Sequence, residues 1–506
     1  MKKVFKYISI SVLVLFATSC DKGFDEMNIR KIAVTSIDPA FILNQAIINI
    51  SPTTSTAIYE MTIVQQMVSP NSGVLTGANF NQDNRALLDP MWTRYYRTVI
   101  RNTKDIISQV KDKSDRGNLY QMTRIVQAYA FMVMTDSFGD IPYSEAGLAY
   151  ISANFQPKYD SQEAIYTDLV KELTEASAAL SASGKIETAD ILYGGDINKW
   201  KKLGYSLLLR AGMRLSEVSP DKAKSVVATA VSGGVMAQNS ESFVIKHDAN
   251  YQNPNGGMLN STEANNWYLA APFVNQLKST NDPRLKSIAV RYVGASSGPQ
   301  QSADKANRDP ALQFGMPMGY DNGTIPAVAK AAGLASFYDY TQADRTRIVK
   351  NTAPQHLVTA SQTQLLLAEA VQRGYITGNV SEYFAKGVTL HMQQMAEHDA
   401  AMAISQADID KYLTENAFQA GKALEQIGVQ YWISSFLNGP EAFANFRRTG
   451  FPKLTPNPYP LKDTKGDFIN RLTYQNSEIS VNSENVKAAI ARMGADNLDT
   501  KVWWDK

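Results

Sequence analysis

The stretch that decides the fold is residues 160–180, which read DSQEAIYTDLVKELTEASAAL. Asp160 and Glu163 match a capping box, in which a polar side chain and an acid three residues later bond the free N–H groups of a helix start. The stretch therefore predicts an amphipathic helix that Asp160 caps. Its apolar residues recur at the spacing of one helix face: Ile165, Leu169, Leu173, Ala176 and Leu180.

Helices with the same periodicity are predicted on both sides of this stretch. One covers residues 119–133, and another follows Asp196, which is its N-cap. The next helix opens at Pro220, because proline suits the first helical position, and Gly233 and Gly234 end it. The turns between these helices are short, so we expect consecutive helices to run antiparallel.

A second pair of helices is predicted later in the chain, over residues 365–371 and 383–395, with Gly374 closing the first of them. Antiparallel pairs that each bury one apolar face are the units of helical-repeat stacks. We therefore expect a mainly α fold of TPR-like helical repeats, without a regular repeat consensus.

Between the two helical zones, residues from about 236 to 342 are rich in Gly, Pro, Asn and Ser, as in NPNGG at 253–257. This composition predicts a long loop-rich insertion. Because long loops in a compact domain are usually functional, we expect this region to form one face of the protein and to be its recognition surface. It is expected to belong to a single helical domain, residues 41–506.

The N-terminus has the layout of an export signal. Three lysines, an apolar run over residues 8–16 and three small residues precede Cys20, the single cysteine of the chain. The apolar run is about half of the roughly 20 residues that a transmembrane helix needs. We therefore predict a signal peptide at 1–19, a lipid on Cys20, and a lipidated tether at 20–40 that anchors the protein to a membrane.

Charge and motif content exclude several functions. Removal of residues 1–19 deletes three of the 50 basic side chains, which leaves 47 against 48 acidic ones, so a nucleic-acid partner is not expected. None of the four histidines pairs at i, i+4 as in zinc proteases, and His391 and His398 lie too far apart in sequence for one metal. No nucleophile elbow, phosphate loop or dinucleotide fingerprint occurs. No catalytic, metal-binding or cofactor site is predicted.

Carboxylates leave one enzymatic alternative open. Two facing acids can cleave a glycosidic bond without any fixed spacing in sequence. Asp136 and Asp140 in TDSFGDIPY are the obvious pair. The preferred interpretation is structural, because Asp140 and Pro142 suit the end of a helix and a turn.

Aromatic residues beside polar ones point to sugar binding. Flat ring faces stack on sugar C–H groups while amides and acids bond the hydroxyls. Trp92 also lies at i, i+3, i+4 with Tyr95 and Tyr96, which is typical of a core stripe. The predicted ligand-binding residues are Phe80, Asn81, Trp92, Trp267, Tyr268, Tyr320, Tyr338 and Tyr340.

Motifs in one order along nearly the whole chain resemble the SusD/RagB-type outer-membrane lipoproteins of Bacteroidetes. They are a lipid site with its acidic follow-on, an aromatic segment, a two-aspartate segment, an Ala-Glu-Ala segment and an arginine pair before a glycine. In chain order these read Ser19-Cys20-Asp21, Trp92-x-x-Tyr95-Tyr96, Asp136-x-Phe138-Gly139-Asp140-Ile141-Pro142-Tyr143, Leu367-Ala368-Glu369-Ala370 and Phe446-Arg447-Arg448-Thr449-Gly450.

The resemblance implies a SusD-like helical fold with TPR-like units. It also implies a surface-exposed, lipid-anchored outer-membrane protein that binds a nutrient and delivers it to a TonB-dependent SusC-like transporter. It transfers no binding residue, because the family's ligand contacts lie in variable loops. The leading hypothesis for the ligand is an oligosaccharide, with a peptide as the runner-up. A carbohydrate-cleaving enzyme and a pure scaffold protein are the rivals from other classes.

Overall fold

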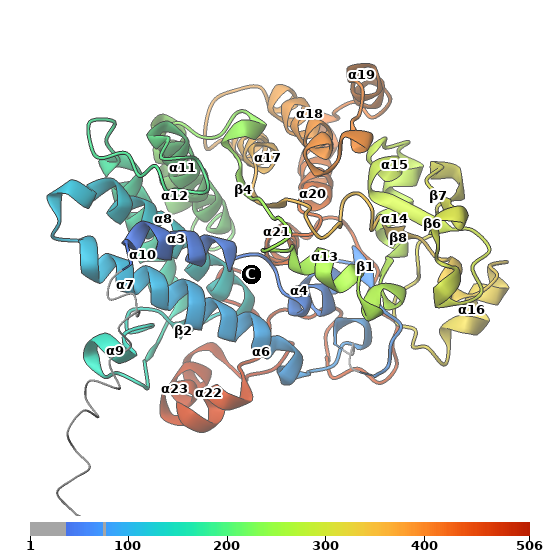
Figure 1. Ribbon diagram of the computed structural model, residues 1–506, viewed down its shortest axis with the longest axis horizontal. Coiled ribbons are helices and arrows are strands. Elements are labelled where there is room, and N and C mark those ends of the chain that lie inside the picture. Colours follow the sequence, from blue (N-terminus) through green and yellow to red (C-terminus); the bar gives the residue numbers. More distant parts are fainter. Residues whose placement is uncertain (1–36, 74–76) are drawn as a thin grey trace, which may run out of the picture. The chain divides into compact units, whose positions relative to one another are not determined.

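The computed structural model describes residues 37–73 and 77–506 (Figure 1). The chain divides into two units, Met1–Pro39 and Ala40–Lys506, and only residues 37–39 of the first unit fall within the described part. The predicted signal peptide, Cys20 and most of the tether lie outside the described residues. In the part of the chain that is described, no helix is both long and apolar enough to cross a bilayer.

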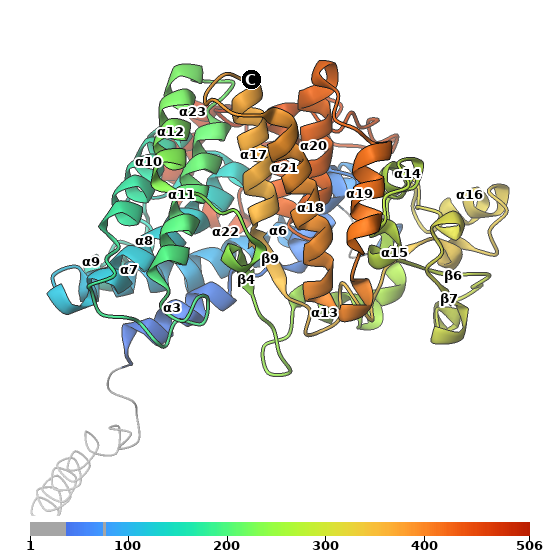
Figure 2. The same cartoon turned by 90° about the horizontal axis from the view of Figure 1, so that it is seen from above.

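The first helical zone consists of stacked neighbours. Helix α7 (Arg101–Val110) packs on α8 (Gly117–Phe138), α8 on α10 (Gln162–Ala179), α10 on α11 (Ile197–Arg214), and α11 on α12 (Pro220–Gly233). Figure 2 shows these helices side by side. The helices predicted here from periodicity are confirmed, including the start at Pro220.

The helix caps follow the sequence signals with one correction. As predicted, the Asp196 carboxylate caps α11 by accepting from the N–H groups of Asn198 and Lys199, at 3.0 and 3.2 Å. The N-cap of α10, however, is Ser161 and not Asp160. Asp160 lies one residue too early to cap, and it pairs instead across a short two-stranded sheet (β2, Ile141–Pro142, with β3, Tyr159–Asp160).

The second helical zone joins the first through a shared core. Helix α17 (Ala360–Gln372) packs on α18 (Val380–His398) and on α20 (Ala423–Ser434), and α20 packs on α21 (Gly439–Thr449). Contacts of α17 with α11 and of α21 with α8 connect the two zones. Gly374 follows α17 with φ +71°, a conformation that glycine adopts without strain. The predicted mainly α, TPR-like fold is confirmed.

A buried ion network lies where the two zones meet. Arg214 on α11 donates to Asp136 on α8 at 3.1 Å and to Glu441 on α21 at 2.8 Å, and Arg210 reaches Glu441 at 3.1 Å. Asp140 accepts from Arg492 at 2.7 Å and from a backbone N–H of α10. Both aspartates of TDSFGDIPY therefore hold helices together, and α8 ends at Phe138, just before Asp140, which fits the structural interpretation that Asp140 and Pro142 lie at a helix end.

Short helices and strands interrupt the predicted loop-rich region. Two- to four-residue strands pair with partners far away in sequence, so that Val68 lies opposite Tyr268 and Phe243 opposite Val358. Segments this short show no measurable periodicity, which is why composition alone predicts loops here. The elements are β4 (Phe243–Ile245), α13 (Pro254–Leu259), β5 (Tyr268–Leu269), α14 (Ala271–Ser279), α15 (Arg284–Ile288), β6 (Ala289–Tyr292), β7 (Ala306–Asn307), α16 (Ile325–Ala331) and β8 (Gln342–Ala343).

The sheets are small. Strand β6 lies between β7 and β8, and β1 and β4 each pair with one distant strand. A π-helical segment over Tyr95–Ile100 makes α6 continuous with α7. The remaining strands and helices are β1 (Met67–Val68), β9 (Gln355–Val358), α3 (Pro39–Ile48), α4 (Thr54–Ile58), α5 (Glu60–Ile63), α6 (Arg85–Arg94), α9 (Ala149–Ser152), α19 (Gln406–Glu415), α22 (Asn476–Val481) and α23 (Ser483–Met493).

Candidate functional site

Two of the predicted binding residues, Trp92 and Trp267, lie in the main core. Their side chains are 4% and 1% exposed. The Trp92 ring meets Phe138 edge to face at 5.0 Å between ring centroids, and the neighbouring Tyr95 is buried as well. Neither tryptophan presents a ring face to solvent, so the core-stripe interpretation fits Trp92 and we leave both residues out of the candidate site.

Phe80 and Asn81 belong to a tightly held loop. Phe80 is buried and stacks on Tyr459 at 4.5 Å. Asn81 is buried too, and it ends the short helix before it in a left-handed conformation, with φ +49°. Both side chains are buried within this loop, so their predicted contact with a ligand would require the loop to open.

Tyr268 and Tyr340 form the centre of a separate small core. Both rings are fully buried, with centroids 6.5 Å apart. The Tyr268 hydroxyl donates to the backbone carbonyl of Asn265 at 2.6 Å. Burial raises the pKa of Tyr340 to about 12, so its hydroxyl stays protonated at neutral pH. These two rings support a surface without being part of it.

Three partly exposed rings pack around this buried pair, and a fourth, Tyr338, stacks on one of them. We call the four rings the aromatic surface: Phe314, Tyr320, Phe337 and Tyr338. Phe314 is 41% exposed and lies 5.9 Å from Tyr340 between centroids. Phe337 stacks on Tyr338 at 4.1 Å, and Phe337 and Tyr320 pack against the small core. Tyr320 and Tyr338 are predicted binding residues. Phe314 is not, because no pattern around it distinguishes it from a core residue.

The loop before Tyr320 is clamped to the N-terminal part of the chain. The side-chain amide of Asn79 donates to the carbonyls of Ser69 and Tyr320, at 2.8 and 3.0 Å, and its oxygen accepts from the Gly319 N–H at 2.8 Å. Gly319 has φ +78°, and a Cβ there would lie 2.5 Å from the Asn457 side chain. Only glycine fits this position without strain.

Phe337 and Tyr338 are held by a capped turn. The Ser336 hydroxyl accepts from the Tyr338 N–H at 3.0 Å, and Gln301 donates to the Tyr338 carbonyl at 2.9 Å. Asp339 is buried beneath the turn and accepts from Arg291 at 2.9 Å. These bonds fix the backbone of the two rings, and a fixed platform loses less entropy when a ligand binds.

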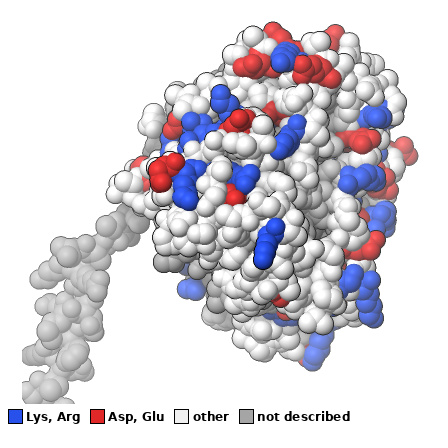
Figure 3. Space-filling model, turned by 90° about the vertical axis from the view of Figure 1, so that its right-hand side faces the viewer, with Lys and Arg blue, Asp and Glu red and all other residues white. Residues whose placement is uncertain are grey.

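The aromatic surface carries few charges. Residues 310–342 contain three ionisable acidic or basic side chains, Asp321, Lys330 and Asp339, and Asp339 is buried in its pair with Arg291. Figure 3 views the side of α16 and β6, and shows most charges near the top, on the left and along the right edge, with one basic side chain in the middle of an otherwise largely uncharged area. Such a surface suits a neutral ligand that offers hydroxyl groups and flat C–H faces.

The chain was compared with known families and structures. A SusD-like family model, described as "Starch-binding associating with outer membrane", matches residues 31–475. A solved chitin-binding protein is 30% identical, covers 92% of this chain and 100% of its own, and superposes with a TM-score of 0.80. A Bacteroidetes AC2a SusD-like structure is 25% identical, with 93% and 100% coverage and a TM-score of 0.81.

A chitin-binding SusD homologue from Flavobacterium johnsoniae, at 24% identity, shares the fold with a TM-score of 0.76 over 92% of this chain and 98% of its own. The curated proteins contain no match to the sequence. The family model spans most of the chain, and the first of these structures aligns along its full length. The resemblance drawn from the motifs is therefore confirmed, and this chain belongs to the SusD-like family.

Proposed function

We propose that this protein binds an oligosaccharide on its aromatic surface and delivers it to a TonB-dependent SusC-like transporter. The observation that carries the proposal is the set of four partly exposed rings around a buried tyrosine pair, on a face with few charges. The family's description as starch-binding and the chitin-binding relatives support a glycan as the ligand class.

Stacking supplies the affinity in this proposal. An aromatic contact contributes roughly 0.5–1.5 kcal/mol beyond the area that it buries. Several such contacts from Phe314, Tyr320 and the Phe337–Tyr338 stack, together with hydrogen bonds from exposed amides such as Asn322, would hold a few sugar units. A peptide would instead need exposed backbone partners along a groove, and the described strands in this region are only two to four residues long.

The rest of the proposal concerns placement. We propose that residues 1–19 are removed, that a lipid on Cys20 and the tether at 20–40 hold the protein at the outer membrane, and that residues 41–506 act as one nutrient-binding domain exposed at the cell surface. The family description, which associates these proteins with the outer membrane, supports this placement. The sequence between Cys20 and residue 37 is long enough to act as a spacer.

Calorimetry of the purified protein against starch and chitin oligosaccharides, and against short peptides, tests the proposal. Phe314→Ala and Tyr338→Ala should each weaken glycan binding roughly three- to tenfold, which corresponds to the loss of one stacking contact. Tyr251→Ala is the matched control, because Tyr251 is 58% exposed and lies outside the aromatic surface.

Three results would contradict the proposal. Glycan affinity that is equal in wild type, Phe314→Ala and Tyr338→Ala would remove the aromatic surface from the mechanism. Binding of peptides alone would replace the ligand class with the runner-up. Release of shorter sugars during the measurement, followed by chromatography, would establish the enzymatic rival.

A further inference from the structure

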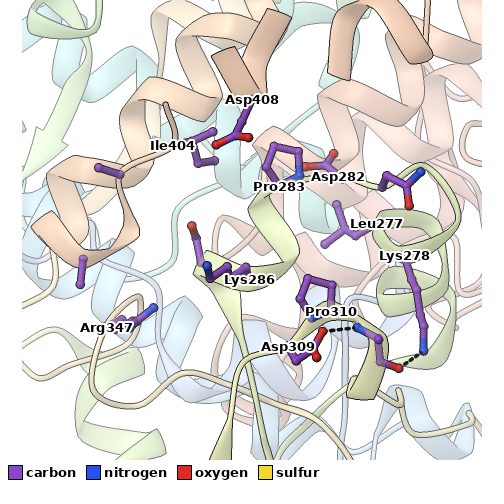
Figure 4. A pocket seen from close by; sticks show the side chains of 15 residues that line it. Leu277, Lys278, Asp282, Pro283, Lys286, Asp309, Pro310, Arg347, Ile404 and Asp408 are labelled. Atoms are coloured by element: carbon purple, nitrogen blue, oxygen red, sulfur yellow. Dashed lines mark hydrogen bonds between the residues drawn. The ribbon is translucent and has the colours of Figure 1, made fainter. Parts of the chain in front are cut away.

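A pocket of about 720 Å³ lies between α14, α15, the turn at Pro310–Leu312 and the segment that leads into α19 (Figure 4). Its volume is typical of sites for small ligands. None of the described residues that line it is aromatic, and the apolar part of its wall is aliphatic, as at Leu277 and Ile404. Ring stacking therefore cannot be the source of affinity here, and the polar side chains must supply it.

Three basic side chains reach this pocket from three different segments. Lys278 donates to the carbonyls of Ala311 and Gln313, at 2.8 and 3.1 Å, which holds the ammonium group without neutralising its charge. Lys286 is exposed and has no hydrogen bond or ion pair within the described chain. Arg347 forms a long ion pair of 3.6 Å with Asp344. Asp344 is also bound by Arg308, at the shorter distance of 2.6 Å. Of the three basic groups, Lys286 is therefore the one that no hydrogen bond or ion pair within the described chain engages, so its charge is open to a ligand.

The acidic side chains of the pocket divide into two kinds. Asp282 is fully buried and neutralised by Arg284, at 2.9 Å. Asp309 and Asp408 are exposed, and their hydrogen bonds are local: Asp309 accepts from the Ala311 N–H at 2.9 Å, and Asp408 accepts from the Ser405 hydroxyl at 2.7 Å. Each keeps oxygen lone pairs that can accept hydrogen bonds from hydroxyl groups.

Figure 4 shows Lys286 between Asp408 on one side and Asp309 on the other. We infer that this pocket binds an anionic sugar unit, whose acid group contacts Lys286 and Arg347 while its hydroxyls donate to Asp309 and Asp408. The inference rests on the proposed glycan-binding function. It adds a second binding site, and it names a class of sugar that the nearly uncharged aromatic surface does not select.

The pocket adjoins the aromatic surface along the chain. The carbonyls of Ala311 and Gln313 that hold Lys278 immediately precede Phe314, so the segment 309–314 forms both the pocket wall and the start of the aromatic surface. One acidic oligosaccharide can therefore place a charged unit in the pocket and an uncharged ring against Phe314.

The test is calorimetry of the full chain with a glucuronate-containing disaccharide, its neutral glucose counterpart, its sulfated counterpart and a tripeptide. Lys286→Met should weaken binding of the acidic disaccharide at least tenfold and leave the neutral one unchanged. Arg347→Met should act in the same direction. Lys224→Met is the matched control, because Lys224 is an exposed lysine on α12, outside both the pocket and the aromatic surface. Added salt should weaken acidic binding only.

The sulfated probe tells which acid group the pocket prefers, and binding of either acidic sugar that depends on Lys286 supports the inference. Equal affinity for acidic and neutral disaccharides, or acidic binding that survives Lys286→Met, overturns it. Tripeptide binding that is lost in Lys286→Met, without acidic sugar binding, overturns it as well. Failure of the proposed function can be told apart from failure of this inference. The proposed function fails if Phe314→Ala leaves the binding of a neutral glycan unchanged.

Discussion

Replacement of Arg214 by Met should strongly destabilise the helical body. Arg214 is fully buried and is the cation that Asp136 and Glu441 share, at 3.1 and 2.8 Å. Methionine fills much of the same volume but leaves Asp136 without an ion-pair partner. Asp136 would keep only its bonds from the Tyr166 hydroxyl and the Trp504 ring N–H, at 2.5 and 2.9 Å.

The expected cost is about 3–5 kcal/mol, the usual effect of removing one partner from a buried ion pair. Glu441 retains Arg210, which places the cost at the lower end of that range. For a unit as long as Ala40–Lys506, unfolding entropy of about 2 cal/mol/K per residue converts this into a fall in Tm of roughly 3–5 °C. Urea unfolding followed by circular dichroism, and calorimetry, measure the two quantities.

The matched control is Lys487→Met, which removes one partner of the exposed pair with Glu484 and should leave Tm unchanged. The substitutions at Arg214 and Asp136 should be energetically coupled, because the cost of Arg214→Met comes from leaving the buried Asp136 carboxylate without its cation. Asp136→Asn should destabilise the wild type but recover stability in the Arg214→Met background. Strictly additive effects of the two substitutions, or an Arg214→Met protein as stable as the control, would refute this account.

The remaining predictions concern buried titratable groups and one glycine. Burial raises the pKa of Glu60 to about 8, against the weaker opposing effect of its bond from Ser137, so the folded state holds a proton that the unfolded state releases. The Glu60 contribution to stability is therefore complete below about pH 4.5 and lost as pH rises toward 8, and Glu60→Gln should match the wild type in melts at pH 4 but exceed it at pH 8. Burial, and then the nearby charges of Arg284, His356 and His398, lower the pKa of His391, whose Nδ1 lies 2.8 Å from an Arg284 nitrogen and accepts its hydrogen bond. Stability should fall as pH drops below about 6.5, the ordinary histidine pKa. In urea titrations, His391→Gln should lose less unfolding free energy between pH 7 and pH 5 than the wild type loses. An identical loss in both proteins would exclude this histidine as the cause. Gly319→Ala should weaken glycan binding, because the added methyl group would displace Tyr320. It should also destabilise the protein more than Gly333→Ala, because both glycines have positive φ but only at Gly319 would a Cβ lie against Asn457. Equal effects of the two substitutions in melting and calorimetry would contradict this explanation.

Much of the helical body could be predicted from local signals. The apolar spacing in residues 160–180, the Asp196 cap and the Pro220 start each lie within one helix, and each element forms as predicted. The error at Asp160 is a single residue, because Ser161 beside it is an equally good cap and only the pairing of β2 with β3 assigns Asp160 to a strand.

The candidate site was far less accessible to sequence reasoning. Loop composition and ring chemistry selected Trp267, Tyr268 and Tyr340 as binding residues, yet all three are buried. Whether these rings point into the core or toward solvent depends on contacts such as the pairing of Val68 with Tyr268, which joins segments about 200 residues apart. Phe314 was missed for the same reason, since its exposure results from how its segment packs beside Tyr340.

The sequence by itself determined the helices, their amphipathic faces and the family, because these depend on the periodicity and order of residues close together in the chain. The tertiary structure alone decided which rings face solvent, which acids are neutralised and where a pocket remains. Those properties depend on long-range packing: a ring or a carboxylate has the same local sequence whether its neighbour from another segment buries it or leaves it open.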